Sequence, residues 1–210
     1  MPARGRLLAL EGIDGCGKST QARALAAVLG AELTHEPGAT PVGQSLRRIL
    51  LDPDRPALAL RTEALLMAAD RAEHVATVVE PALAAGTWVV SDRYSGSTIA
   101  YQGFGRGLPP DQLATLVAFA ADGVAADLSI LVDVDVDVAA ARLAADGGGD
   151  RLERLGIDFA SRVREGFLTQ AVADPEHWVV VDGTEDERAL TAHIVAAVHD
   201  RLGDPPSISR

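Results

Sequence analysis

The sequence predicts an α/β fold in which helices cover both faces of a parallel five-stranded sheet. Two observations lead to this expectation. Apolar runs of strand length alternate with segments of helical periodicity along the whole chain, which is typical of βαβ units with right-handed crossovers. The 210 residues also contain no internal repeat and no linker-like stretch. We therefore expect a single domain over residues 1–203, followed by a flexible tail at 204–210.

The expected strands are five apolar runs that polar or glycine-containing turns separate. They cover residues 6–12, 31–36, 87–94, 127–136 and 177–183. Helical spacing of apolar residues predicts the helices between and after them. These helices cover residues 18–29, 44–51, 61–85, a segment that contains Phe159, Val163 and Phe167, and residues 185–202. The longest helix contains Pro81, which is expected to kink it or to end it early.

A glycine-rich motif directly after the first expected strand indicates a phosphate-binding loop. Residues 12–19 read GIDGCGKS, which fits the P-loop motif G-x-x-x-x-G-K-[ST] between a strand and a helix. Glycines let backbone N–H groups approach phosphate oxygens, and the helix N-terminus attracts anions. The motif therefore predicts a P-loop NTPase-type fold, the alternative being a glycine-rich turn without a ligand. The residues expected to contact the nucleotide are Gly12, Ile13, Asp14, Gly15, Cys16, Gly17, Lys18, Ser19 and Thr20.

Lys18 is the only lysine of the chain, which otherwise uses eighteen arginines for its basic side chains. An ammonium group on a flexible stem can follow a phosphate through a reaction, whereas the planar guanidinium of arginine has a fixed donor geometry. Lys18 is thus expected to hold the β- and γ-phosphates, and Ser19 to offer its hydroxyl to Mg²⁺.

A second pair of polar residues is expected at the same edge of the sheet. Asp92 lies near the end of the third apolar run, and Arg93 follows it. Because parallel strands end at a common edge, Asp92 should lie beside the P-loop, where a carboxylate suits Mg²⁺ bound through water. Arg93 is then placed to clamp a second phosphate. The alternative is a helix-capping aspartate followed by a solvated arginine.

The composition excludes several classes of protein. A net charge of −11 argues against a general nucleic-acid binder, and no apolar run approaches the length of a membrane span. The absence of asparagine rules out the Asn-Lys-x-Asp element of GTPases. The lone Cys16 is compatible with a reducing compartment, so we expect a cytoplasmic protein. Small-molecule kinases and nucleotide-binding regulators remain as candidates.

Five stretches resemble the thymidylate kinase family in order and spacing. They read LEGIDGCGKSTQA, HEPGATPVGQSLRRILLD, EALLMAADRAEHV, PALAAGTWVVSDRYSGSTIAYQGFGRGL and DRLERLGIDFASRVREGF. The DRY-x-x-S-T-x-A-Y-Q-G segment and the E-P-G loop are far more specific than the P-loop, which many families share. The resemblance implies transfer of the γ-phosphoryl group of ATP to dTMP, with Mg²⁺, a short mobile lid and a homodimer.

The resemblance also implies roles for single residues. Asp14 is expected near the transferring phosphates and the acceptor, and Arg93 and Arg71 are expected to hold the phosphate and the nucleoside of dTMP. The remaining residues expected to bind dTMP are Glu36, Pro37, Met67, Ser97, Thr98, Tyr101 and Gln102. Gly38 completes the E-P-G loop beside the acceptor.

Several of these residues have a plainer interpretation from the sequence alone. Arg71 fits a solvated charge in the middle of a helix, Ser97 and Thr98 fit a helix surface, and Tyr101 fits the core. The resemblance instead implies that Ser97 and Thr98 read the thymine edge and that Tyr101 lies near the sugar.

Two positions depart from the family pattern. The family usually has an aromatic residue that stacks on thymine where this chain has Met67, and an arginine before Glu-Pro-Gly where this chain has His35. A thioether can pack on a base but offers no ring. Neither position belongs to the phosphoryl-transfer machinery.

The lid is expected at about residues 143–157, which contain a glycine run followed by DRLERLG. Some members of the family carry a basic residue in the P-loop where this chain has Gly15, so the lid is expected to supply that charge. Arg151 is the leading candidate for a catalytic arginine, with Arg142 and Arg154 as the others. The alternative is a flexible loop with local ion pairs.

The leading hypothesis is a Mg²⁺- and ATP-dependent dTMP kinase. A kinase for another nucleoside monophosphate is the nearest alternative, because of Met67 and His35. A catalytically silent nucleotide-binding regulator is a further alternative, disfavoured because the P-loop lysine and the arginines are present.

Overall fold

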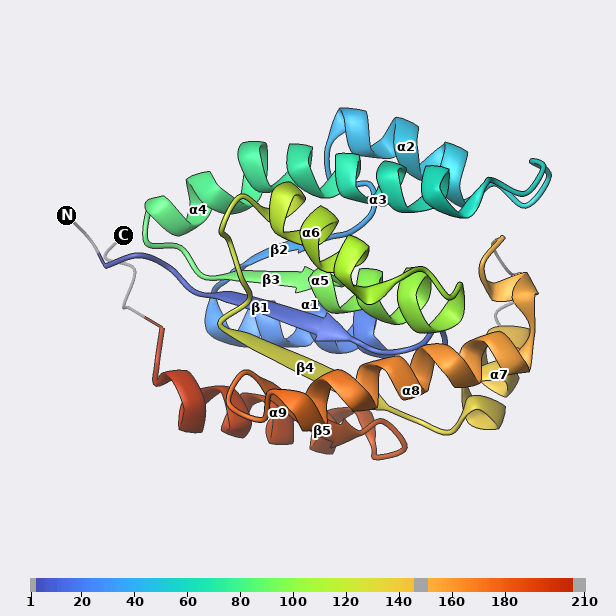
Figure 1. Cartoon of the computed structure of the whole chain (residues 1–210). Coiled ribbons are helices and arrows are strands. Elements are labelled where there is room, and N and C mark those ends of the chain that lie inside the picture. Colours follow the sequence, from blue (N-terminus) through green and yellow to red (C-terminus); the bar gives the residue numbers. More distant parts are fainter. Residues whose placement is uncertain (1–2, 146–150, 206–210) are drawn as a thin grey trace.

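The computed structural model describes residues 3–145 and 151–205. Its centre is a five-stranded sheet of order β2-β3-β1-β4-β5, in which all four strand pairings are parallel (Figure 1). The strands are β1 (Leu7–Glu11), β2 (Glu32–His35), β3 (Val89–Asp92), β4 (Leu128–Asp133) and β5 (Trp178–Asp182). Each lies inside an apolar run that the sequence predicts, and the predicted five-stranded α/β fold is confirmed.

Helices surround this sheet. Their bounds are α1 (Lys18–Leu29), α2 (Pro41–Leu51), α3 (Leu60–His74), α4 (Glu80–Ala84), α5 (Ser95–Thr98), α6 (Pro110–Ala121), α7 (Val136–Ala145), α8 (Ile157–Ala173) and α9 (Glu187–Leu202), with the π-helical segments η1 (Val75–Val79) and η2 (Ile99–Gly105) and the short 3₁₀ helix η3 (Glu153–Leu155). The helix expected over residues 61–85 exists as the continuous run α3–η1–α4. Pro81 does not end it: the π-helical turn precedes the proline, which lies in the first turn of α4, where its missing N–H costs least.

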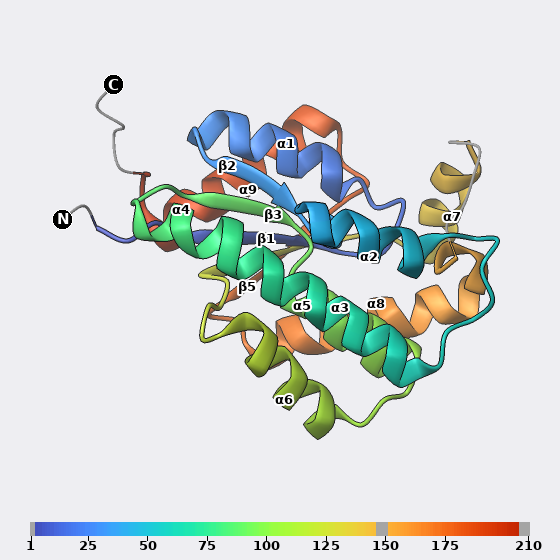
Figure 2. The same cartoon turned by 90° about the horizontal axis from the view of Figure 1, so that it is seen from above.

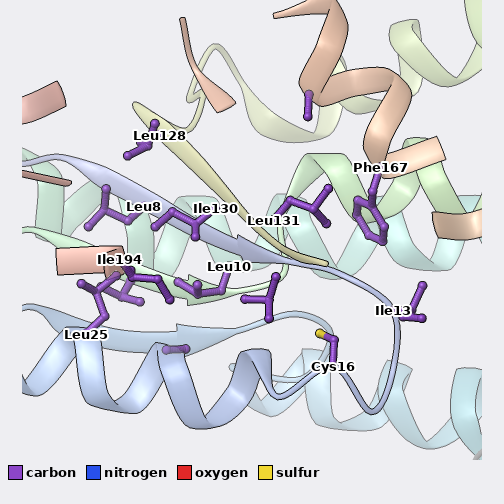
Figure 3. Close-up of a cluster of buried hydrophobic side chains, with 14 of the residues drawn as sticks. Leu8, Leu10, Ile13, Cys16, Leu25, Leu128, Ile130, Leu131, Phe167 and Ile194 are labelled. Carbon is purple, nitrogen blue, oxygen red and sulfur yellow. The ribbon is translucent and has the colours of Figure 1, made fainter. Parts of the chain in front are cut away.

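Alternating side chains of β1 build the two halves of the core, as expected for a strand buried on both faces. Leu8 and Leu10 pack in the cluster that includes residues of α1 and α9, part of which Figure 3 shows. Leu7 and Ala9 point to the opposite face, in a cluster with η1 and α4. Figure 2 shows α1 and α9 on one side of the sheet and α3, α5, α6 and α8 on the other.

Two glycines allow the close packing of η2 against α8. A Cβ atom added to Gly105 would lie 2.6 Å from the ring of Phe159, and one added to Gly166 would lie 2.8 Å from the ring of Phe104. Protein interiors are close-packed, so a side chain at either glycine would force the neighbouring ring or the backbone to move. The contact keeps η2 and its inward side chains at a fixed depth beside the P-loop.

The carboxyl ends of β1 and β3 are brought together by their pairing. The register places Leu10 opposite Asp92, and the loop after β1 therefore lies beside the segment after β3. In α/β sheets such an edge is where ligands bind.

The predicted domain limits, lid and tail stay predictions. Residues 146–150 of the expected lid and 206–210 of the expected tail lie outside the described residues. Within the described ranges, no helix combines the length and the apolar character that a membrane span requires.

Candidate active site

A cavity of about 360 Å³ lies at the carboxyl edge of the sheet, between the P-loop, the loop after β2, α3 and the segment after β3. It brings together most of the residues that the sequence singles out as candidates. Those that line it are Asp14, Gly15, Lys18, Ser19, Glu36, Pro37, Met67, Arg71, Asp92, Arg93, Ser97, Thr98, Tyr101 and Gln102. Residues from four separate segments thus share one site.

The P-loop has the backbone that its glycines predict. Gly12, Gly15 and Gly17 have φ values of 143°, 83° and 95°, which side chains disfavour. A Cβ atom added to Gly15 would lie 2.4 Å from the carbonyl oxygen of Ala139 in α7. This chain therefore has no room at that position for the basic residue that some relatives carry there.

Lys18 is buried at the start of α1, with its side chain 8% exposed. Its ammonium group lies 3.2 Å from Oδ1 of Asp14 and 3.4 Å from the carbonyl oxygen of Ile13. The charge is therefore held over the P-loop, at the helix N-terminus where anions bind.

Asp14 joins the P-loop to the segment after β3. Arg93 donates to its Oδ1 at 2.5 Å and Tyr101 to its Oδ2 at 2.6 Å, and Arg93 also donates to the carbonyl oxygen of Gly12 at 3.0 Å. Burial opposes ionisation of Asp14, but the positive charges of Arg93 and Lys18 outweigh it and hold the pKa well below its ordinary value. The carboxylate is thus ionised at neutral pH.

Arg93 has a left-handed backbone, with φ 74°, which is uncommon for a residue other than glycine and concentrates at functional sites. The guanidinium lies 4.9 Å from the centre of the Tyr101 ring and also donates to Oγ of Ser97 at 2.9 Å. These contacts exclude the interpretation of Arg93 as a solvated residue.

Ser19 and Asp92, the two residues expected to hold Mg²⁺, are in direct contact. The Ser19 hydroxyl donates to Oδ2 of Asp92. Oδ1 of Asp92 is buried and has no hydrogen-bond partner in the described part of the chain, although buried polar atoms are normally paired. Hydroxyl and carboxylate oxygens are the donors that Mg²⁺ prefers, so these residues fit the ion. No group of three or more His, Cys, Asp or Glu side chains that could hold a metal ion occurs among the described residues.

Arg71 lies at the other end of the cavity and is 3% exposed. It donates to Oε2 of Glu36 at 2.9 Å, to Oγ1 of Thr98 at 2.9 Å and to the carbonyl oxygen of Tyr94 at 3.0 Å. Burial opposes ionisation of Glu36, but Arg71 and His74 outweigh it and lower the pKa. The structure thus excludes a solvated Arg71 and a surface position for Thr98, which is 3% exposed.

Tyr101 belongs both to the core and to the site. Its ring makes edge contacts with Phe159 and Phe167 at centroid distances of 6.1 and 6.2 Å, while its hydroxyl reaches Asp14. The core position that the sequence suggests for Tyr101 is therefore confirmed, while its expected place near the sugar stays a prediction.

Three of the expected arginines, Arg142, Arg151 and Arg154, are not among the residues that line this cavity; Arg154 lines a second cavity. Arg142 donates to the carbonyl oxygens of Cys16 and Gly183, at 3.3 and 3.0 Å, and so borders the outer side of the P-loop. Arg151 lies away from the P-loop: it donates to Oε2 of Glu63 at 2.8 Å and to the carbonyl oxygen of Leu50 at 2.7 Å. The buried carboxylate of Glu63 attracts it there, and a role on the phosphates stays a prediction.

The structure adds groups that the sequence analysis does not single out. Arg47 of α2 lines the cavity and donates to the carbonyl oxygen of Pro37 at 2.8 Å. Asp70 also lines it, with Oδ2 buried and unpaired within the described residues, and burial together with the charge of Glu36 raises its pKa to about 6. The only signal for them in the sequence is their place next to recognised motifs.

Glu11 is a further addition, fully buried below the site. Its Oε1 accepts from the backbone N–H groups of Tyr94 and Ser97, at 3.0 and 3.1 Å, and its Oε2 accepts from Oγ of Ser97 at 2.6 Å. Burial raises the pKa of Glu11 to about 7, although these hydrogen bonds and Arg93 act in the other direction. Glu11 thus fixes the turn between β3 and α5 that orients Arg93.

The sheet order and the loop after β1 place the chain in the class of P-loop nucleoside triphosphate-binding proteins. A family model described as thymidylate kinase matches residues 10–194. The chain therefore belongs to the thymidylate kinase family.

Individual relatives agree with this assignment over nearly the full length. Thymidylate kinase from Cupriavidus pinatubonensis is 44% identical over 198 residues, which cover 91% of this chain and 96% of that relative. Thymidylate kinase from Desulforudis audaxviator is 43% identical over 209 residues, or 97% of this chain and 94% of the relative. A crystal structure of thymidylate kinase from Ehrlichia chaffeensis superimposes with a TM-score of 0.78 at 28% identity, covering 94% of this chain and 100% of the other.

The buried Glu11 predicts a pH dependence of stability. Its carboxyl group ionises near pH 4.5 when unfolded and at a pKa of about 7 when folded. Between these values the folded state binds the extra proton, so this group makes the free energy of unfolding fall as the pH rises, by at most about 1.4 kcal/mol per pH unit. Glu11→Gln removes the titration, and the stability of the wild type relative to this variant should therefore fall between pH 5 and 7.

Urea unfolding at a series of pH values measures this difference. Glu165→Gln, which changes an exposed carboxylate on α8, is the control and should show a difference from the wild type that varies little over the same range. A constant difference between the wild type and Glu11→Gln would contradict the raised pKa.

Proposed function

We propose that this chain is a cytoplasmic enzyme that transfers the γ-phosphoryl group of ATP to dTMP, giving dTDP and ADP. The observation that carries the proposal is the single cavity in which the P-loop and Lys18 face a second set of buried cationic and polar groups around Arg71. A donor end and an acceptor end thus share one cavity, as a reaction between two phosphates requires. The expected location agrees with a lone, buried Cys16 that needs no oxidising compartment.

The donor end binds ATP, the phosphate donor of the family. The P-loop N–H groups and the N-terminus of α1 hold its phosphates, with Lys18 as a mobile charge on the transferred group. Ser19 and Asp92 would hold Mg²⁺, which supplies charge neutralisation on the β- and γ-phosphates when bound. Asp14 stays ionised between Lys18 and Arg93 and orients both cations.

The acceptor end holds dTMP. Arg93 donates to the acceptor phosphate, while Arg71 and Thr98 provide donors for the nucleoside. Tyr101 lines the same cavity, where it limits the room at the sugar. Because the attacking phosphate of dTMP is already anionic, the reaction needs alignment and charge neutralisation rather than a general base.

A panel of acceptors tests this function. The purified chain, with ATP and Mg²⁺, should release ADP with dTMP at a higher kcat/KM than with dUMP, UMP, CMP or AMP. Chelation of Mg²⁺ should abolish turnover, and Lys18→Ala should reduce it by at least about 10²-fold because a charge on the transferred phosphate is lost.

The panel also decides between the alternatives. A coupled assay of ADP release measures each acceptor, with release in the absence of acceptor subtracted. Equal rates with all acceptors would favour a broader nucleoside monophosphate kinase, and nucleotide binding without release of ADP would favour a silent regulator.

Met67 predicts a specific weakness in thymine binding. It lines the acceptor end of the cavity where the family usually has an aromatic ring. An aromatic contact adds about 0.5–1.5 kcal/mol beyond burial, so Met67→Phe should lower KM for dTMP by about 2- to 10-fold with a smaller change in kcat. Met67→Leu, which keeps the volume but adds no ring, should leave KM close to that of the wild type, and equal effects of both variants would contradict the stacking role.

A homodimer is proposed from the family resemblance and from two exposed apolar side chains. Leu65 on α3 is 58% exposed and Phe119 on α6 is 85% exposed, and these two helices contact each other, so one partner surface could cover both side chains. Analytical ultracentrifugation should give a molecular mass in solution of twice the chain mass. The substitution Phe119→Asp should lower this mass toward that of the monomer. Val172→Asp on α8, where the side chain is 81% exposed, should leave the mass unchanged; a monomeric wild type would refute the dimer.

A further inference from the structure

Glu63 is a buried carboxylate for which the reaction described above has no use. It lies in the first turn of α3, and its side chain is 0% exposed. Its Oε1 accepts from Nε2 of Gln102 at 3.1 Å and from Nε of Arg106 at 3.1 Å. Its Oε2 accepts from Nη2 of Arg106 and from Nη2 of Arg151, both at 2.8 Å.

Glu63 is ionised in this environment. Burial favours its neutral form, but the hydrogen bonds from Arg106, Gln102 and Arg151 outweigh burial and lower the pKa. An ionised carboxylate can only accept hydrogen bonds. Each group that contacts Glu63 must therefore turn a donor toward it.

This requirement fixes the orientation of the Gln102 side-chain amide. The amide has an NH₂ donor on one side and an oxygen acceptor on the other, and an acceptor-only partner decides which of the two orientations is adopted. The NH₂ group faces Glu63, so the oxygen faces away from it. Gln102 is 2% exposed and lines the acceptor end of the cavity together with Arg71, Thr98 and Met67.

The pyrimidine bases differ at the atom that such an oxygen would meet. Thymine carries an N–H donor at N3, whereas N3 of cytosine is an acceptor. An amide oxygen held toward the base bonds the first and repels the second, and a buried acceptor opposite another acceptor is costly. We propose that Glu63 is a positioning residue that holds the Gln102 amide as a hydrogen-bond acceptor toward the base and thereby favours thymine over cytosine. This inference rests on the proposed function, since it concerns the acceptor of the same site.

The substitution Glu63→Gln tests the orientation directly. Two arginine N–H groups, from Arg106 and Arg151, meet at the Oε2 position, whereas one, from Arg106, meets Gln102 at the Oε1 position. The Gln102 amide can turn and the arginines cannot, so the new amide places its oxygen at the Oε2 position and its NH₂ group at the Oε1 position. Gln102 then meets a donor instead of an acceptor. It turns its oxygen toward residue 63 and its NH₂ group toward the base, where a donor suits N3 of cytosine.

The readout is the ratio of kcat/KM for dTMP to kcat/KM for dCMP. Glu63→Gln should lower this ratio by about 10- to 100-fold, mainly through a higher KM for dTMP and a lower KM for dCMP. If Glu63 had a purely structural role, the substitution would lower kcat/KM for dTMP and for dCMP by the same factor and leave the ratio unchanged. That result would overturn the proposal. Failure of the wild type to phosphorylate dTMP would instead refute the proposed function, so the two failures are distinguishable.

Arg106→Gln is the matched control. It perturbs the same network and removes a cation that lies 5.3 Å over the Phe159 ring, but it leaves Glu63 ionised by Arg151 and still facing Gln102. It should lower the melting temperature and keep the dTMP to dCMP ratio of the wild type. A ratio that falls as far as in Glu63→Gln would also contradict the proposal.

Glu63→Gln leaves two buried arginines without an anion, which costs stability. If that variant does not fold, the double variant Glu63→Gln, Arg106→Gln takes its place because it removes one of the unpaired cations. The same fall in the ratio is expected relative to Arg106→Gln alone, and its absence would overturn the proposal.

Discussion

The contact between Asp14 and Arg93 is the interaction on which the rest of the site depends. It joins the P-loop to the segment after β3, and it exists because β3 pairs with β1 in the sheet. Lys18 and Tyr101 meet the same carboxylate, so three elements converge on one anion. The loop that binds phosphates is thereby held in shape before a nucleotide arrives, which is the preorganisation that electrostatic catalysis requires.

Three buried glutamates support this arrangement, each from below a different part of the cavity. Glu11 fixes the turn that orients Arg93, Glu36 holds Arg71, and Glu63 holds Gln102 together with two arginines. Burial by itself acts to raise the pKa of each carboxyl group, and the hydrogen-bonding and charged partners decide whether the pKa is raised or lowered in the end. Glu36 and Glu63 have direct arginine partners and ionise, whereas Glu11 is met chiefly by neutral N–H and O–H donors and has a pKa of about 7.

The sequence is sufficient to predict the sheet, most of the helices around it and the P-loop, because these depend on local periodicity and on a short motif. It also predicts that Asp92 and Arg93 lie beside the P-loop, since parallel strands end at one edge. It does not predict α6 (Pro110–Ala121), or the π-helical turn that carries the chain past Pro81. Nor does it predict that Arg71 is buried, because the carboxylate that neutralises Arg71 lies 35 residues earlier. Partners this far apart in the chain leave no periodic signal.

Packing around the P-loop limits which residues can place a positive charge beside it. Gly15 has no room for a basic side chain because the carbonyl oxygen of Ala139 lies against it, so position 15 cannot supply the further cation that the sequence analysis expects from the lid. Arg151 is at present bound to Glu63, yet its departure would not leave that carboxylate alone. Arg106 donates to both of its oxygens, a bidentate geometry that keeps a buried anion compensated. Glu63 can therefore keep its charge, and with it the orientation of Gln102, whether Arg151 is bound to it or not.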